Sequence, residues 1–174
     1  IIIDEPNFDF TDYLISFSPN GEIVAATNIF TEGIKGVRLF DTQSGNLLQS
    51  LEINEVTRSN FVFSPDGKFL AIGYPDGSVD LFDAYSGTLI NSLKQKDSGL
   101  YDSSASISFS PDGNLVATGG SDRVIRIWNT QDGTLFRTLS DFHHDVHQIS
   151  FSHDGRHLAS LTNAARLWDV NDGS

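Results

Sequence analysis

The part of this chain best equipped for chemistry is residues 141–147, where three histidines and two aspartates stand within seven positions. Zinc takes imidazole nitrogens and carboxylate oxygens as ligands, so this composition makes the segment a candidate metal site. The segment leads from a loop into a strand, however, and such a path does not gather its side chains around one ion. We therefore predict no metal and no cofactor.

Other residues of catalytic type lack the spacing that catalysis needs. A hydrolase serine sits on a strained turn within Gly-x-Ser-x-Gly, and that sequence is absent. Gly119 and Gly120 lack the spacing and the lysine of a phosphate-binding loop. The repeated acid-Gly pairs do not follow calcium-loop spacing. We expect these residues to form turns, and the protein not to be an enzyme.

Composition narrows the classes of partner. The chain has 174 residues, of which 39% are hydrophobic, and its formal net charge is -12. Because nucleic-acid binding requires clustered Lys and Arg, and none is visible, we expect no nucleic-acid partner. The acidity suits basic partners or solubility. The apolar run Ile1–Ile3 is too short for a signal peptide or a membrane span, so we expect no membrane contact and a cytoplasmic location. Cysteine is absent, which rules out disulfides and thiolate metal sites.

Two short phrases recur along the chain in step with each other. Phe-Ser-Pro-Asp-Gly, or a close variant, begins at Phe17, Phe63, Phe109 and Phe151, which lie 46, 46 and 42 residues apart. An apolar residue, an aromatic residue and then Asp or Asn follow each other at 39–41, 81–83, 127–129 and 167–169. Two phrases repeated in register indicate one structural unit present four times.

Each unit reads as four antiparallel strands. In the third unit, Ser-Pro-Asp-Gly suits a type I turn between strands at 106–109 and 115–118. A third strand at 124–128 alternates with period two, and a fourth follows at 134–139. Such a sheet has two faces, so neighbouring units must cover both. We predict a core of eight recurring aromatic residues: Phe17, Phe63, Phe109, Phe151, Phe40, Phe82, Trp128 and Trp168.

These units resemble WD40 repeats, the blades of a β-propeller, over nearly the whole chain. The Trp-Asp dipeptide itself appears at 168–169, while the other units have Phe-Asp or Trp-Asn. The resemblance implies an all-β fold: a WD40-type β-propeller with four blades of four-stranded antiparallel sheet. It implies one domain over residues 1–174, with repeats at approximately 1–45, 46–87, 88–133 and 134–174.

Many WD40 repeats contain a structural hydrogen-bond tetrad of His, Ser or Thr, Asp and Trp. The third unit offers Thr118, Asp122 and Trp128 but no His. The fourth offers Ser160, Trp168 and either His143 or His144, but no Asp. The second unit keeps only Asp76, and the first keeps none. Because no unit has a full tetrad, we expect packing to carry more of the stability.

The two ends of the chain fall within incomplete units. Ile1–Ile3 resembles the outer strand of a preceding or ring-closing blade, and the chain stops at Ser174, where the last outer strand would begin. Methionine is absent, even from position 1, so we expect a processed, engineered or excised chain, and favour a segment of a longer one. Four blades could close alone. Exposed sheet edges favour a larger ring, completed by further blades of the same polypeptide or by a second copy.

The resemblance also implies a function in protein binding. Loops at the mouth of a WD40 ring commonly bind a protein or peptide. Six loop residues have the aromatic or guanidinium groups that anchor interfaces: Phe30, Tyr74, Arg123, Tyr101, Arg58 and Phe142. Phe142 could instead tuck under a blade. We predict a scaffold or sensor module; a structural assembly module is the alternative, and a propeller enzyme has no supporting residue.

Overall fold

The computed structural model of the chain describes residues 13–28, 36–53, 60–74, 78–94, 106–140 and 143–174. Within these ranges it has fifteen strands and no helix. Accordingly, no described helix is long and apolar enough to span a membrane. The expected outer strand at Ile1–Ile3 lies outside the described residues.

The strands form four antiparallel sheets, each built from consecutive strands in sequence order. The first sheet has β1 (Tyr13–Phe17), β2 (Ile23–Asn28), β3 (Gly36–Asp41) and β4 (Leu47–Glu52). The second has β5 (Asn60–Phe63), β6 (Phe69–Gly73), β7 (Val79–Asp83) and β8 (Leu89–Leu93). The third has β9 (Ser106–Phe109), β10 (Leu115–Gly119), β11 (Ile125–Asn129) and β12 (Leu135–Leu139). The last has β13 (Gln148–Phe151), β14 (His157–Leu161) and β15 (Ala165–Asp169).

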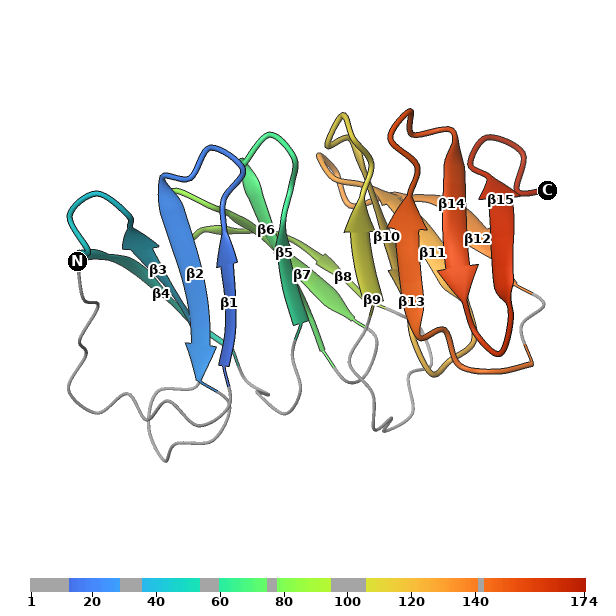
Figure 1. Cartoon of the computed structure of the whole chain (residues 1–174), viewed down its shortest axis with the longest axis horizontal. Helices are drawn as coiled ribbons and strands as arrows, with labels where there is room; N and C mark the ends of the chain where they lie inside the picture. Colours follow the sequence, from blue (N-terminus) through green and yellow to red (C-terminus); the bar gives the residue numbers. More distant parts are fainter. Residues whose placement is uncertain (1–12, 29–35, 54–59, 75–77, 95–105, 141–142) are drawn as a thin grey trace.

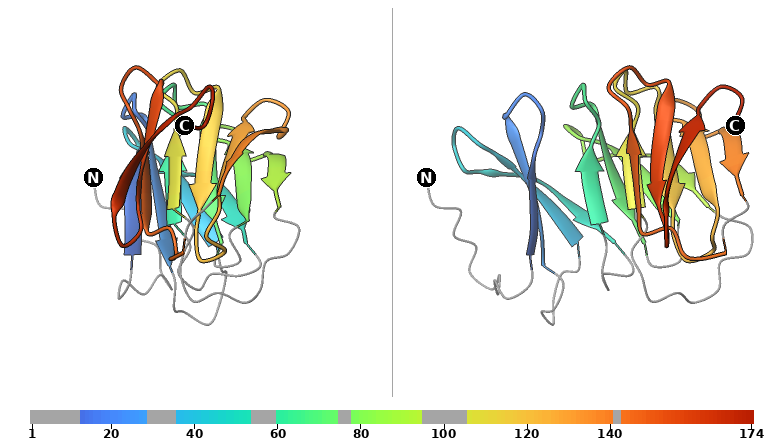
Figure 2. Two further views of the ribbon diagram at one scale, coloured as in Figure 1. Left: turned by 90° about the vertical axis from the view of Figure 1, so that its right-hand side faces the viewer. Right: turned by 45° about the vertical axis from the view of Figure 1, so that its right-hand side comes forward.

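The sheets are the blades of a propeller arranged as an open arc. They follow one another in sequence order along the longest axis of the molecule (Figure 1). The right-hand view of Figure 2 shows the first and last sheets at opposite ends of this row. Each complete sheet ends with a strand that the sequence repeats assign to the next unit: the first sheet runs to Glu52, beyond the repeat boundary at 45.

The Ser-Pro-Asp-Gly turns fix the register of the first two strands in each sheet. In the third sheet, Gly113 N donates a 2.9 Å hydrogen bond to the carbonyl of Ser110. Gly113 has φ +73°, a left-handed conformation that glycine adopts without steric cost. Leu115 N then donates to Ser110 Oγ at 2.9 Å, so the serine side chain closes the hairpin from within. The turn therefore aligns β9 with β10 and places Phe109 opposite Val116.

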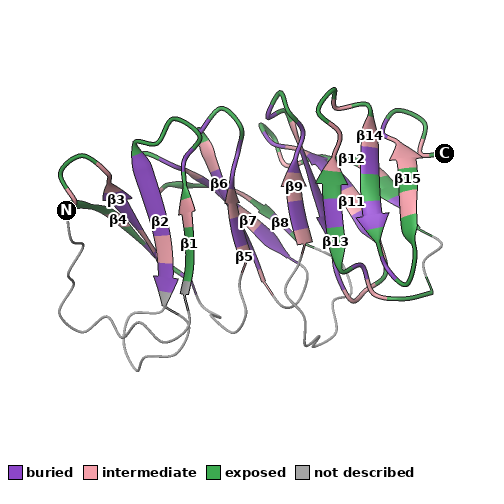
Figure 3. Cartoon of the chain, in the orientation of Figure 1, coloured by how far each residue is buried: buried purple, intermediate pink, exposed green. Residues whose placement is uncertain are grey.

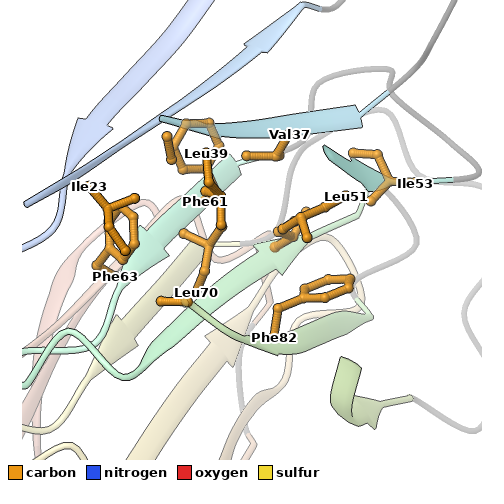
Figure 4. Packing of buried hydrophobic residues seen from close by; sticks show 12 residues of the cluster. Ile23, Val37, Leu39, Leu51, Ile53, Phe61, Phe63, Leu70 and Phe82 are labelled. Atoms are coloured by element: carbon orange, nitrogen blue, oxygen red, sulfur yellow. The ribbon is translucent and has the colours of Figure 1, made fainter. Parts of the chain in front are cut away.

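The hydrophobic core lies between the sheets, in three separate clusters. The first joins the faces of the first and second sheets and is shown in Figure 4. The second cluster joins the second and third sheets, and the third cluster joins the third and last sheets. In each case small and branched residues of one sheet meet aromatic residues of the next, as Leu39 meets Phe61 and Ile23 meets Phe63 in Figure 4. Each sheet is thus stabilised chiefly by its neighbours.

Six of the eight aromatic residues belong to these interface clusters, whereas Phe17 and Phe40 belong to none of them, although Phe40 is buried. Phe40, Phe63, Phe82, Phe109 and Trp128 are buried. Phe151 and Trp168 are partly buried against the third cluster. Phe17 is 62% exposed, so its predicted core position is wrong. The reason is its location: Phe63 and Phe109 face the preceding sheet, and no described sheet precedes the one that contains Phe17.

This difference predicts unequal costs for the same substitution at equivalent positions. In dilute solution, Phe109→Ala should lower the free energy of unfolding by about 3–5 kcal/mol, because it opens a cavity between two sheets. Phe17→Ala should change it by about 0.5 kcal/mol or less, as expected of an exposed side chain. Urea unfolding followed by circular dichroism measures both. Equal losses would contradict this account of the core.

Candidate functional site

The structure describes two of the six predicted partner-binding residues, Tyr74 and Arg123. The other four lie outside the described residues: Phe30, Arg58, Tyr101 and Phe142. Tyr74 is partly buried and packs against the cluster between the first two sheets. Its hydroxyl donates a 2.8 Å hydrogen bond to Asp80 Oδ2. These contacts give Tyr74 a packing role, and its contribution to a partner site stays a prediction.

Arg123 is exposed on the turn between β10 and β11. Among the described residues it is the only one other than glycine with a positive φ, 63°. Its Nε lies 3.6 Å from Asp145 Oδ1, and both side chains are substantially exposed. An ion pair of this kind contributes little to stability, since water screens it. The guanidinium is therefore accessible at this edge of the arc, and its part in partner binding also stays a prediction.

The bond between Trp and a hydroxyl, which is one part of the expected tetrad, forms in the third sheet and in the last sheet. Trp128 Nε1 donates to Thr118 Oγ1 at 3.1 Å, and both residues are buried. Trp168 Nε1 donates to Ser160 Oγ at 2.9 Å. Each bond links the second and third strands of its sheet across the face that packs on the preceding sheet. The indole N–H is thereby satisfied where water is excluded.

The other two expected tetrad members take different positions. Asp122 accepts a 2.5 Å hydrogen bond from Arg126 Nη1 and a 3.2 Å bond from Val124 N, so it stabilises its own turn. His143 is exposed, which contradicts the structural position expected of it. The physical reason is that Val146 anchors this connection. It is buried, packs in the third cluster and donates from its backbone N to the carbonyl of Gly120 at 2.9 Å.

Gly119 is needed beside that anchor. A Cβ at Gly119 would lie 2.9 Å from Val146 Cγ1, closer than packed carbons approach. The glycine therefore lets the connection to the last sheet pack directly against β10.

The Trp128 bond yields a stability prediction. Thr118→Val should lower the free energy of unfolding by about 1–3 kcal/mol, because the buried indole N–H loses its acceptor while the side-chain volume is kept. Thr138→Val, at an exposed position of β12, should change it by about 0.5 kcal/mol or less. Thermal and urea unfolding measure the difference. Similar values for the two variants would show that the Trp128 bond contributes nothing.

The described residues contain neither a cluster suited to a metal ion nor a catalytic grouping in their surface hollow. No group of three His, Asp or Glu side chains gathers there in a way that could hold an ion. Asp141 and Phe142 of the predicted histidine segment lie outside the described ranges. A surface hollow of about 320 Å³ is lined by Asn114, Asn129, Gln131 and Asp132. That lining contains one carboxylate and three amides, with no nucleophile beside a base.

Acidic turn residues accept hydrogen bonds that stabilise their ionised form. The 2.5 Å hydrogen bond from Ser110 Oγ is the largest effect on the pKa of Asp112 and lowers it, against partial burial. The hydrogen bond from Ser152 Oγ likewise lowers the pKa of Asp154. In the first sheet, Asn20 takes this position and accepts from Ser18 Oγ at 2.7 Å without carrying a charge.

The Asn20 geometry makes Asp112→Asn a conservative test. A carboxylate whose pKa is lowered on folding contributes stability above its unfolded pKa, and this is lost as pH falls through the folded pKa. The unfolding free energy of the wild type should therefore decline as the pH drops below about 4. Asp112→Asn should make that decline less steep and slightly lower the stability at pH 7, because the amide keeps the turn geometry but loses the charge. An unchanged acid slope in urea unfolding would contradict the prediction.

The third residue of β8 and the third residue of β12 connect these outer strands to the next sheet through side-chain hydrogen bonds. On β8, Asn91 Nδ2 donates to the carbonyl of Thr130 at 3.1 Å. On β12, Arg137 Nε donates to the carbonyl of Val170 at 3.0 Å, and its guanidinium bonds two further carbonyls of the same turn. These bonds fix β8 to the turn that precedes β12, and β12 to the turn that follows β15.

Next to these connections, each outer strand exposes two adjacent apolar residues, which we call the rim pairs. They are Leu47–Leu48 on β4, Leu89–Ile90 on β8 and Leu135–Phe136 on β12, and all six side chains are 41–50% exposed. Their exposure follows from a β-bulge that recurs in all three sheets. On β4, Phe40 lies opposite Leu47 and Leu39 opposite Gln49, so Leu48 has no partner. The same shift leaves Ile90 and Phe136 without partners.

Sequence reasoning missed the rim pairs. Their signal was present, because two adjacent apolar residues begin each fourth strand. Regular alternation would turn one of them inward, however, and only the bulge leaves both accessible.

Comparison with protein families agrees with this architecture. The model described as WD domain, G-beta repeat matches residues 87–129 and 133–169. The model described as anaphase-promoting complex subunit 4 WD40 domain matches residues 54–103. Together the two models extend over residues 54–129 and 133–169. No curated protein matches the chain.

Proposed function

Since the chain belongs to the WD40-repeat family, we propose that it is a non-catalytic module that binds a protein or peptide and serves as a scaffold or sensor domain. WD40 repeats generally mediate protein–protein interactions, and domains built from them are typically non-catalytic. The hollow lined by turn amides offers no catalytic grouping that would argue otherwise. A cytoplasmic location remains part of the proposal.

The observation that carries the proposal is the set of rim pairs. Outer strands are sheet edges, and edges that must only avoid aggregation present charged side chains or proline. Here three successive edges present Leu, Ile or Phe at the same two positions, beside a bulge that turns them outward. Exposed apolar groups at recurring positions are typical of surfaces that bind other proteins.

Charge indicates which partners suit this surface. The chain carries 23 acidic and 11 basic residues, so its field favours a partner with Lys and Arg around an apolar segment. The cation at one rim pair, Arg137, lies with its Cζ 5.7 Å from the centre of the Phe136 ring, and its guanidinium is already bonded to three backbone carbonyls. We propose a basic, partly apolar peptide segment as the ligand. The predicted edge site with Arg123, which lies beside Asp145, is a second place where a partner could bind.

Selection from a random phage-displayed peptide library tests the proposal. Immobilised protein should enrich peptides that combine apolar residues with Lys or Arg. The selected peptide should bind Ile90→Asp at least about tenfold more weakly by calorimetry, because a carboxylate replaces an apolar contact; tenfold corresponds to about 1.4 kcal/mol. In parallel, Arg123→Ala measures the contribution of the predicted edge site.

Two matched variants control for charge and exposure. Leu161→Asp places the same new charge at an equally exposed apolar site away from the outer strands. Arg156→Ala removes an exposed arginine on the turn between β13 and β14. Both should bind the peptide like the wild type. The proposal fails if no peptide is enriched, or if neither Ile90→Asp nor Arg123→Ala weakens binding.

A further inference from the structure

The hollow in the third sheet is lined mainly by hydrogen-bond acceptors. It lies where the turn between β9 and β10 meets the turn between β11 and β12, and Thr130 N joins the two turns by donating to the carbonyl of Asn114 at 3.0 Å. Both turns belong to the upper edge of the arc in Figure 1, and Figure 3 shows that much of this edge is exposed. Asn114, Gln131 and Asp132 are exposed and Asn129 is partly buried, so the hollow is accessible.

A chain of hydrogen bonds fixes the orientation of the Asn129 amide. The hydroxyl of Thr134 has one proton, which it donates to Asp132 Oδ1 at 2.7 Å. The Asn129 amide must therefore be the donor at this hydroxyl, and its Nδ2 lies 2.8 Å from Thr134 Oγ1. The Oδ1 of Asn129 is the amide atom that remains, and it accepts no hydrogen bond from the residues that the structure describes.

Two further acceptors come from Asn114 and Asp132. Asn114 Nδ2 donates to Asp112 Oδ2 at 2.8 Å, and because a carboxylate can only accept, the Oδ1 of Asn114 is left over. Asp132 Oδ1 accepts from both Thr134 N and the Thr134 hydroxyl, whereas its Oδ2 accepts nothing within the described ranges. The bond from the Thr134 hydroxyl lowers the pKa of Asp132, so this carboxylate is charged at neutral pH.

The other sheets have a charged residue where the third has Asn114. The second sheet has Lys68, whose Nζ lies 2.9 Å from Asp66 Oδ2. The last sheet has Arg156 at this position, and the first has Glu22. The second and last sheets thus supply a cation beside their own acidic turns. Asn114 supplies none, which leaves the charge of the hollow to be balanced from outside.

We propose that the hollow binds the side-chain ammonium of a lysine in the partner peptide, an assignment that rests on the proposed binding of a basic, partly apolar segment. An ammonium group has three N–H donors and no acceptor, which matches the acceptor oxygens of Asn114, Asn129 and Asp132. Arginine fits less well, because its guanidinium favours both oxygens of a carboxylate and Asp132 Oδ1 already accepts two bonds.

The hollow and one rim pair belong to the same short stretch of chain. Asp132 precedes Leu135 by three residues, and Asn129 N closes the turn between them by donating to the carbonyl of Thr134 at 2.9 Å. A peptide can therefore place an apolar side chain on Leu135–Phe136 and a nearby lysine in the hollow. The formal charge of -12 favours the approach of such a lysine.

Calorimetry with the peptide selected by phage display tests the assignment. Asp132→Asn keeps an oxygen for the Thr134 bonds but loses the charge, so it should weaken binding about tenfold, as expected for a hydrogen bond to a charged group. Replacing the bound lysine of the peptide with Nε-acetyl-lysine should weaken binding to the wild type to a similar extent. The two changes together should cost no more than either alone, because both remove the same contact.

Asp172→Asn is the matched control. Asp172 occupies the equivalent turn position in the last sheet, and its Oδ1 likewise accepts from a backbone N, that of Ser174 at 2.8 Å. This variant should bind the peptide like the wild type, and both variants should retain the wild-type circular dichroism.

Capped lysine, acetyl-lysine amide, probes the hollow without the rim pairs. At millimolar concentration it should shift the side-chain amide resonances of Asn114 and Asn129 in the NMR spectrum. Acetyl-norleucine amide, which has the same stem without the ammonium, should not shift them. The shifts should be lost in Asp132→Asn and kept in Asp172→Asn.

Several results would overturn the assignment. They are equal peptide affinity of the wild type and Asp132→Asn, selected peptides that contain Arg but no Lys, and no shift with capped lysine. If Ile90→Asp weakens peptide binding while Asp132→Asn does not, the proposed function stands and the lysine site fails. If no peptide is enriched, the proposed function fails, and the titration with capped lysine alone decides whether the hollow binds an ammonium group.

Discussion

The structure depends on one constraint: a four-stranded antiparallel sheet with two apolar faces is stable only when a neighbour covers each face. The three hydrophobic clusters satisfy it, since each draws residues from two adjacent sheets and none lies within a single sheet. Leu81 and Ile127 are completely buried because another sheet follows theirs, whereas Leu167 at the same register is exposed. The neighbour, more than the residue type, therefore determines burial in this chain.

The polar interactions follow the same arrangement. Within a sheet, serine and aspartate close the turns, and tryptophan binds a hydroxyl on the strand beside it. Between sheets, Asn91 and Arg137 hold the turn of the next sheet, while Ser106 and Ser108 bind the backbone of the next inner strand. Because these bonds connect groups that the apolar packing has already brought together, they specify the spacing of the sheets more than they supply its driving force.

The sequence predicted the positions of the strands well. It predicted less well which side chains a neighbouring sheet would bury. The repeated phrases located the strands of the third sheet within one residue, and they identified Phe63 and Phe109 as core residues. The same phrase begins at Phe17, but a repeat contains no information about whether a sheet precedes it. The outward turn of Ile90 depends on a bulge, and the packing of Tyr74 on a loop conformation. Neither is encoded in hydrophobic periodicity.

Native-state hydrogen exchange in dilute solution tests the mutual covering of the sheets most directly. Amides of β6, β7, β10 and β11, whose sheets have a neighbour on both sides, should exchange at rates near those set by global unfolding. Amides of β14 and β15, with one neighbour, should exchange faster through local opening of the last sheet. If β14 and β15 proved as protected as β6 and β7, each sheet would be stable by itself and the account would be contradicted.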